Sequence, residues 1–265
     1  MGSLPAKAST RIVAALKKFK PIITAARAKD VNESDTVVIV TDLLQEMFGY
    51  DKYNEITSEH VIRGTSCDLA IKVEDAIVLL IEVKAIGLEL KDQHVKQAVD
   101  YAANQGCDWV VLTNGIFWRI YKVTFGKPIE KELVVELNML ELNPRSDDDI
   151  ELVGLLAREA WQKERLGEYL EQKQALSRFT IAAVLLSDTV LAVVRRELRR
   201  VSPEVHIDVE EIANALRTDV LKREALDGEK AQEAQKRVAR SANTTLRDTK
   251  EADSGDAKSS PDSKS

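Results

Sequence analysis

The sequence predicts a mixed α/β (α+β) fold, with a core in the order helix, three strands, helix, strand and a helical domain after it. Two apolar runs, Leu69–Val73 and Ala76–Ile81, are separated by a short polar pair, as in two strands joined by a tight turn. Residues 90–104 repeat apolar side chains at helical spacing. From about residue 147 the composition becomes helical, and after Glu229 apolar residues almost vanish.

Length and composition indicate a soluble globular protein with a core of ordinary size. The chain has 265 residues, of which 44% are hydrophobic and 31% are charged. We expect four parts: a basic N-terminal helical arm over residues 1–29, an α/β domain over 30–142, a helical domain over 143–228, and a disordered tail over 229–265.

Two helices are expected ahead of the sheet. Residues 8–28 have the pattern of a basic amphipathic helix that Pro21 is expected to break or kink. A second helix begins at Asn32 or Ser34, either of which can cap it, and ends near Met47.

The two central strands are expected to bring charged side chains together. Ala76–Ile81 is continuously apolar, like a strand buried on both faces, and it runs directly into Glu82, Val83 and Lys84. Side chains alternate along a strand, so Glu82 and Lys84 share one face. If the two strands pair as a hairpin, Asp68 lies near the same end as Glu82. Two carboxylates and a lysine then meet at the end of a buried sheet, where charge is costly unless it is paired or used.

Such a cluster has the parts for metal-dependent phosphodiester hydrolysis. Two carboxylates suit a hard divalent cation such as Mg²⁺, which keeps several of its waters. The metal favours ionisation of water and stabilises charge on a phosphoryl oxygen, and a nearby ammonium can orient the attacking water. The alternative is a structural ion pair of Lys84 with Asp68 or Glu82, and a lone E-x-K triplet in a chain this rich in charge does not exclude it.

The helix over residues 90–104 is expected to lie beside this cluster. His94, Gln97 and Tyr101 are spaced i, i+3 and i+7, so they share one helical face that can cross a cleft. A solvated helix flank is the plainer reading of the same spacing.

The remaining elements follow from apolar runs and turn residues. Asn114-Gly115 between two apolar runs is a strong hairpin signal. The expected strands are Asn54–Thr57, Trp109–Thr113, Ile116–Val123 and Glu132–Leu140, and the expected helices are Ile150–Leu170, Phe179–Val201 and Val209–Leu226, the last with a capping box of Asp208 and Glu211.

Asp68, the triplet Glu82-Val83-Lys84 and the pair Gln97 and Tyr101 resemble the PD-(D/E)XK nuclease superfamily. More narrowly, they resemble the N-terminal nuclease domain of type I restriction enzyme R subunits over about residues 30–125. Further landmarks of the narrower resemblance are Asn32-Glu33-Ser34-Asp35-Thr36, Phe48-Gly49-Tyr50, Glu59, Leu112-Thr113-Asn114-Gly115 and Phe117-Trp118. One departure is Cys67, which stands where the superfamily motif has its proline.

The resemblance implies a restriction-endonuclease-like core and a role for each motif residue. Asp68 and Glu82 would be ligands of Mg²⁺ or Mn²⁺, and Lys84 would be the catalytic lysine. Glu33 would be an auxiliary acid, and Gln97 with Tyr101 would support the site or contact DNA. The expected function is therefore a metal-dependent endodeoxyribonuclease of restriction-enzyme type.

Two other functions remain open at this point. One is a non-cleaving module that keeps the nuclease fold and binds nucleic acid or a partner, which the acidic net charge of -6 and the large helical domain motivate. The other is a structural protein that forms homo-oligomers through its helical domain. The sequence has no G-x-x-x-x-G-K-[ST] phosphate loop, so any ATP-driven motor, like a modification subunit, is expected to be a separate protein.

Charge distribution and cysteine content narrow the expected partners. Residues 1–29 contain no acidic side chain, and Arg195–Arg200 forms a second basic cluster. Either could neutralise DNA phosphates, although a solvated helix face is the plainer reading of the second cluster. Cys67 and Cys107 are the only two cysteines, they lack metal-type spacing, and the sequence shows no secretory apolar segment, so no disulfide is expected and a cytoplasmic location fits. No membrane association is expected, because no apolar run reaches membrane length.

Overall fold

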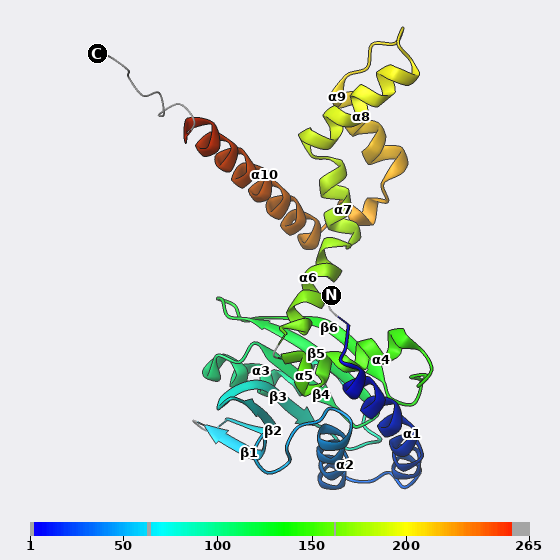
Figure 1. Cartoon of the computed structure of the whole chain (residues 1–265), viewed down its shortest axis with the longest axis vertical. Coiled ribbons are helices and arrows are strands. Elements are labelled where there is room, and N and C mark those ends of the chain that lie inside the picture. The colour runs from blue at the N-terminus through cyan, green and yellow to red at the C-terminus, as the bar shows by residue number, and fades with distance from the viewer. Residues whose placement is uncertain (1–2, 63–64, 162, 256–265) are drawn as a thin grey trace, which may run out of the picture. The chain divides into compact units, whose positions relative to one another are not determined.

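The computed structural model describes residues 3–62, 65–161 and 163–255, with the backbone alone for residues 59–62, 65–66 and 243–255. The chain divides into two compact units, residues 1–170 and 171–265 (Figure 1). The first unit therefore extends beyond residue 142, where the sequence placed the end of the α/β domain.

One six-stranded sheet forms the centre of the first unit, and its strands follow chain order. Neighbouring strands are antiparallel except β3 and β4, which run parallel because helix α3 (Asp92–Gln105) connects them. The strands are β1 Ile56–Ile62, β2 Thr65–Val73, β3 Ala76–Val83, β4 Trp109–Thr113, β5 Phe117–Thr124 and β6 Glu130–Asn138. The predicted mixed fold and its element order are confirmed. The first strand is longer than predicted, so Glu59 and His60 lie inside it rather than beyond it.

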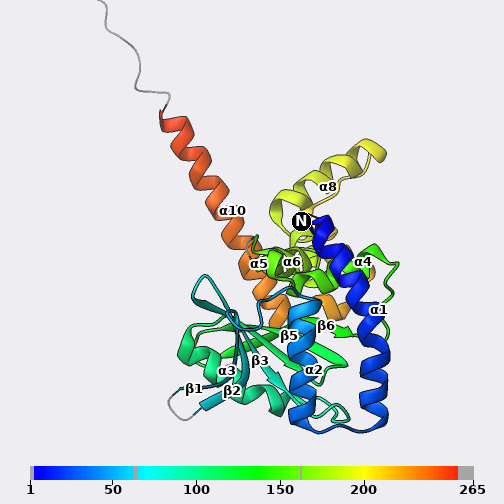
Figure 2. The same ribbon diagram turned by 60° about the horizontal axis from the view of Figure 1, so that its bottom comes forward.

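Helices cover both faces of the sheet (Figure 2). Helices α1 (Ala6–Ala28) and α2 (Glu33–Glu46) pack on the face that carries Leu79 and Ile81. Helix α3 packs on the opposite face, which carries Leu80. The two cores are thus separated by the sheet, and the two-residue alternation of β3 assigns each of its side chains to one of them.

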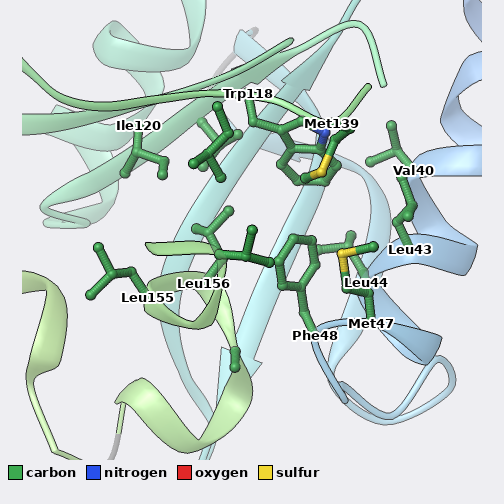
Figure 3. Packing of buried hydrophobic residues seen from close by; sticks show 14 of the residues in the cluster. Val40, Leu43, Leu44, Met47, Phe48, Trp118, Ile120, Met139, Leu155 and Leu156 are labelled. Atoms are coloured by element: carbon green, nitrogen blue, oxygen red, sulfur yellow. The ribbon is translucent and has the colours of Figure 1, made fainter. Parts of the chain in front are cut away.

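The larger core joins α2 to the sheet and to the segment after β6. Figure 3 shows Met47 and Phe48, at the end of α2, directed toward Trp118 of β5. The rings of Phe48 and Trp118 are tilted at 58° with their centroids 5.3 Å apart, a favourable aromatic geometry. Leu155 and Leu156 close the same core.

Helix α1 runs without interruption through Pro21, so the predicted break is wrong. Pro21 lies on the exposed side of the helix, where the carbonyl of Lys17 that loses its helical donor can be hydrated. The opposite side buries Leu16, Phe19 and Ile23, and this packing holds the helix together on both sides of the proline.

The predicted helix Ile150–Leu170 is divided into three. Helix α4 (Asp147–Val153) ends at Gly154, a short 3₁₀ turn follows, and α5 (Arg158–Trp161) and α6 (Arg165–Ala175) come after it. A side chain at Gly154 would lie 2.7 Å from a methyl carbon of Leu4, so a glycine is needed for this close approach. The turn directs the next two leucines into the main core.

The second unit contains helices α7 to α10. The predicted helix Phe179–Val201 is interrupted: α7 (Arg178–Leu185) ends before Ser187, whose backbone is extended, and α8 (Asp188–Val201) starts after it. The predicted capping box of Asp208 and Glu211 is confirmed at the start of α9. Helix α9 itself is shorter than predicted (Val209–Ala215) and is followed by a π turn over Leu216–Val220 and a 3₁₀ turn over Arg223–Ala225.

The tail that was predicted to be disordered from Glu229 contains helix α10 over residues 229–255. Residues 256–265 lie outside the described part of the chain. Alanine, lysine, glutamate and glutamine favour helix, and α10 packs against α7 through the buried Ala231 and Ala234. Arg237 secures this contact by donating to the backbone carbonyl of Gln174 (3.1 Å) and to Thr180 Oγ1 (2.6 Å). Among the described residues, no helix combines the length and the hydropathy needed to cross a bilayer.

Candidate functional site

The hairpin of β2 and β3 places Asp68 beside Glu82. Glu74 and Asp75 form its turn with positive φ angles of 51° and 65°, the backbone that a tight two-residue hairpin turn requires. The register pairs Leu69 with Ile81, so the next position toward the strand ends sets Asp68 opposite Glu82. The backbone N–H of Val83 donates to Asp68 Oδ2 at 2.7 Å, which fixes the first carboxylate at the end of β3.

Glu82 projects from β3 on the side of α3, and Lys84 pairs with it. Leu80 belongs to the core beneath α3, and Glu82 follows it by two residues, so their side chains share a face. The side chain of Glu82 is 7% exposed, and its Oε1 lies 2.8 Å from Lys84 Nζ. A charged group buried to this extent is stable only with a partner, and the lysine supplies one.

Glu33 is the third acid at the cluster. It starts α2, whose first turn is capped by Asn32 through a 2.9 Å bond from Asp35 N–H. Glu33 Oε1 lies 3.4 Å from Lys84 Nζ, and its side chain is 48% exposed. The start of α2 and the end of β3 thus meet at one ammonium group, which lies between a buried and an exposed carboxylate.

The electrostatics of the cluster favour a cation. Burial raises the pKa of Glu82 above its usual value and the charge of Asp68 raises it further, although the hydrogen bond from Lys84 opposes the change. Burial alone would lower the pKa of Lys84, but the hydrogen bond and charge of Glu82, with Glu33 and Asp68, raise it. Lys84 is therefore an ammonium at neutral pH, and the acidic pair carries negative charge that one lysine does not balance.

Asn114 holds the chain that follows Lys84, a role that the sequence reasoning missed. Its Nδ2 donates to the carbonyls of Ile86 (3.3 Å) and Leu88 (2.9 Å), and its Oδ1 accepts from the N–H groups of Ile116 (3.1 Å) and Phe117 (2.8 Å). The side chain is buried and makes full use of both its ends. The sequence indicates only a hairpin turn at Asn114, and its place after a buried strand is the one signal of a further role.

The backbone of Lys84 is anchored on the same strand that leads to Asn114. Its N–H donates to the carbonyl of Thr113 at 2.8 Å, which extends the parallel pairing of β3 and β4 by one residue. The Lys84 side chain therefore begins from a fixed backbone position.

Gln97 and Tyr101 occupy different environments on α3. Tyr101 is fully buried in the core between α3 and the sheet, together with Cys67, and burial raises the pKa of its hydroxyl. Gln97 is exposed. His94 caps the helix instead of facing a cleft, since its Nδ1 accepts from the N–H of Lys91 at 3.1 Å. The expected shared face is therefore divided between a helix cap, solvent and core.

Cys67 occupies the motif's proline position as a buried thiol. Its Sγ lies 3.0 Å from the carbonyl oxygen of Ile81 on β3, and burial raises its pKa to about 12. The thiol is therefore neutral and packs within the hairpin. Cys107 is likewise a free, buried cysteine.

The donor set fits a hard divalent cation that retains water ligands. Mg²⁺ is typically held by one or two protein carboxylates at oxygen, and Asp68 with Glu82 supplies two. The described residues contain no group of three or more histidine, cysteine, aspartate or glutamate side chains that could hold a metal. A fully protein-enclosed site is therefore not formed there, whereas a two-carboxylate site agrees with the geometry.

Several cations of the N-terminal arm have structural partners. Arg11 donates to Glu159 at 2.7 and 2.8 Å and to the carbonyls of Met47 and Phe48 at 3.0 Å each. Lys20 donates to the carbonyls of Leu140 and Leu142. These two side chains join α1 to neighbouring segments, so they are not available to neutralise phosphates.

A cavity of about 560 Å³ lies elsewhere in the first unit. Its lining residues are Gly49, Tyr50, Asp51, Asn54, Glu55 and Arg158. Arg158 and Glu55 form a 2.6 Å ion pair at its wall. None of the six residues that the sequence proposed for a site lines this cavity, so it is separate from the acidic cluster.

Comparison with known proteins gives one match. Residues 38–137 match the family described as Type I restriction enzyme R protein N terminus. The matched segment contains Asp68, Glu82, Lys84, Gln97 and Tyr101, while Glu33 lies just before it. No curated protein and no solved structure shows significant similarity to the chain.

Proposed function

We propose that the chain is a metal-dependent deoxyribonuclease that hydrolyses phosphodiester bonds at the end of β3. The carrying observation is the convergence of Asp68 and Glu82 at one strand end with Lys84 Nζ 2.8 Å from Glu82 Oε1. The family match over residues 38–137 supports a nuclease-related function for the segment that contains these side chains.

Each residue of the cluster has a distinct role in this proposal. Asp68 and Glu82 would hold Mg²⁺ or Mn²⁺, which when bound would supply positive charge and favour ionisation of water. Lys84 acts as an ammonium that orients the attacking water and stabilises negative charge on the phosphate, since its raised pKa makes it a poor base. Glu33 positions Lys84 from the exposed side.

Gln97 and Tyr101 support the site in different ways. Tyr101 packs α3 on the sheet beside Cys67, so it maintains the layer from which Glu82 projects. Gln97 is exposed on α3 and would contact DNA. Neither residue is proposed to take part in the chemical step.

A non-cleaving nucleic-acid-binding module is the second candidate. The observation that favours it is the pairing of Lys84 with both Glu82 (2.8 Å) and Glu33 (3.4 Å), which gives the buried carboxylate a cation without a metal.

Cleavage assays separate the two candidates. The purified chain is incubated with DNA and Mg²⁺ or Mn²⁺, beside Asp68→Asn, Lys84→Ala and the control Glu74→Gln. Glu74 lies at the turn of the same hairpin, at the opposite end from the cluster. Metal-dependent cleavage by wild type and Glu74→Gln, with at least a 100-fold loss in the other two, is expected. Equal cleavage by all four proteins, or DNA binding without cleavage under either metal, would refute the nuclease proposal.

A further inference from the structure

Helix α8 carries the densest group of positive charge in the second unit. Arg195, Arg196, Arg199 and Arg200 fall within six consecutive residues that contain one acid, Glu197. This segment has a net charge of plus three (four arginines less one glutamate), whereas the chain as a whole carries -6. Positive charge is therefore concentrated here against the overall balance.

The packing of α8 turns these arginines toward solvent. Leu191 is buried and Val194 packs beside it against Ile212 and Ala213 of α9. At about 100° per residue, the four arginines span an arc of about 140° whose centre lies away from this apolar side. The side chains of Arg196 and Arg200 are 69% and 75% exposed, Arg199 is also exposed, and Arg195, at the edge of the arc nearest Leu191, is partly exposed. The four guanidinium groups thus form one surface, which we call the α8 arginine face.

Helix stability does not account for the α8 arginine face. Arg195 with Arg199 and Arg196 with Arg200 are like-charge pairs at i, i+4, each of which costs about 0.2–0.5 kcal/mol. Favourable interaction with the helix dipole applies to the last turn, which holds Arg199 and Arg200 alone of the four.

Salt bridges account for only part of the α8 arginine face. Glu197 pairs with Arg196 (3.1 Å) and Arg200 (3.0 Å), but exposed pairs of this kind contribute little. In the described part of the chain, no ion pair reaches Arg195 or Arg199. Alternating charge signs are typical of an exposed helix face with many salt bridges, whereas this face has four arginines and one glutamate.

The basic N-terminal arm offers no comparable surface. Of its cations, Arg11, Lys18 and Lys20 are engaged with acids or carbonyls of the first unit. The others, Lys7, Lys17, Arg27 and Lys29, are exposed but are spread along the length of α1 and around its axis.

We propose that the α8 arginine face binds the phosphate backbone of double-stranded DNA, without base recognition. A guanidinium group binds phosphate oxygens through bidentate hydrogen bonds. Arginines at i and i+4 project from Cβ atoms about 5–6 Å apart, so they can reach neighbouring phosphates. The choice of DNA rests on the proposed nuclease function. The surface would hold DNA through a unit that the family match does not include.

Salt-dependent binding tests this proposal without any cleavage. Affinity of the full chain for a labelled duplex of about 30 base pairs is measured by fluorescence anisotropy in EDTA over a range of salt concentrations. The test variant replaces Arg195, Arg196, Arg199 and Arg200 with glutamine. The control variant replaces Lys7, Lys17, Arg27 and Lys29 with glutamine, so both lose the same charge. A third variant replaces the four arginines with lysine.

The four-glutamine variant on α8 should bind DNA at least 10-fold more weakly than wild type. The slope of its log binding constant against log salt concentration should be shallower by about two to four, since each phosphate contact contributes about 0.9 to that slope. The lysine variant should keep most of the salt dependence, and the control should match wild type. Equal losses in the α8 and control variants would overturn the proposal, as would the absence of DNA binding by wild type.

Two further outcomes are informative. If the α8 substitutions abolish binding to vesicles containing phosphatidylserine but leave DNA binding unchanged, the surface is a lipid-binding one and the proposal is wrong. Melting curves verify that each variant is folded. If the four-glutamine variant unfolds, the double variant Arg195→Gln with Arg199→Gln is used in its place. If wild type does not cleave DNA with either metal, but the four-glutamine variant on α8 still loses salt-dependent DNA binding, the nuclease proposal is refuted and the proposal of the DNA-binding α8 arginine face is supported.

Discussion

Lys84 Nζ lies 2.8 Å from Glu82 Oε1, and the two residues are separated by one position at the end of a buried strand. These two residues are close in the sequence, but the other acids of the cluster come from distant segments. Asp68 reaches the site from β2, and Glu33 reaches it from the start of α2. The cluster therefore exists only when the hairpin and the first helix layer are both in place.

Asp68→Asn should stabilise the fold while it weakens metal binding. The asparagine Oδ1 can still accept the Val83 N–H, and the substitution removes a negative charge that raises the pKa of Glu82. We expect the free energy of unfolding to rise by about 0.5–1 kcal/mol, as at other sites where function and stability conflict. Urea denaturation in EDTA measures it. A loss of stability greater than 1 kcal/mol would show that Asp68 is a structural residue.

Lys84→Met should destabilise the protein in a pH-dependent way. The substitution leaves the Glu82 carboxylate buried without its cation, which we expect to cost about 2–3 kcal/mol at pH 7. The pKa of Glu82 is raised above 4.5 in the folded protein, so the folded state binds this proton more tightly than the unfolded state does. The contribution of Glu82 to stability therefore becomes more favourable as pH falls through its folded pKa toward 4.5. The difference between variant and wild type should therefore shrink between pH 7 and pH 5.

Melting temperatures at several pH values measure this difference. Lys72→Met, at a β2 position away from the cluster, is the control. A deficit in Lys84→Met that stays constant with pH would contradict the assignment of a buried, charged Glu82.

Asn114→Ala should destabilise the first unit more than an ordinary turn substitution. It removes all four hydrogen bonds of a buried side chain and leaves two carbonyls and two N–H groups to find other partners. We expect a loss of about 3 kcal/mol, against about 1 kcal/mol for Asn138→Ala, whose side chain accepts one N–H from Leu140. Equal losses in the two variants would contradict the structural role of Asn114.

Arg11→Met should reduce stability without changing DNA binding. The hydrogen bond from Arg11 holds the pKa of Glu159 below its usual value, although burial opposes it. A lowered carboxylate pKa stabilises the fold above the usual value of 4.5, and this stability is lost as pH falls through the folded pKa. The melting temperature of the variant should therefore be lower than that of wild type at pH 7. The deficit should shrink as pH falls below 4.5 and through the folded pKa of Glu159, leaving the part that comes from the lost hydrogen bonds to the carbonyls of Met47 and Phe48.

Anisotropy with labelled DNA supplies the second measurement on Arg11→Met, and Lys17→Gln is the matched control at an exposed position of the same helix. Weaker DNA binding by Arg11→Met alone, with normal stability, would assign Arg11 to the DNA surface instead.

The sheet was predictable because its signals are short-range. The apolar runs of β2 and β3, their two-residue turn and the alternation that aligns Glu82 with Lys84 all follow from neighbouring residues. The mixed topology was also predictable, since the helix between β3 and β4 allows them to run parallel.

The incorrect or missed predictions concern segments whose conformation depends on packing against residues far away in the sequence. Nothing local to Pro21 shows that a buried face holds α1 together across it, and nothing near Gly154 shows that Leu4 lies against it. The polar sequence after Glu229 gave no sign of α10, because two small alanines and Arg237 suffice to pack it on α7. The same limit hid Asn114, whose four partners belong to two separate segments.

Calorimetric titration of Mn²⁺ or Mg²⁺ into the full chain tests the central claim most directly, because it requires no knowledge of the DNA substrate. Wild type is compared with Glu82→Gln, Asp68→Asn and the hairpin-turn control Glu74→Gln. We predict saturable binding in wild type and Glu74→Gln, and a loss of at least 10-fold in affinity in the other two. Equal binding in all four proteins, or no binding in wild type, would contradict the assignment of Asp68 and Glu82 as a metal site.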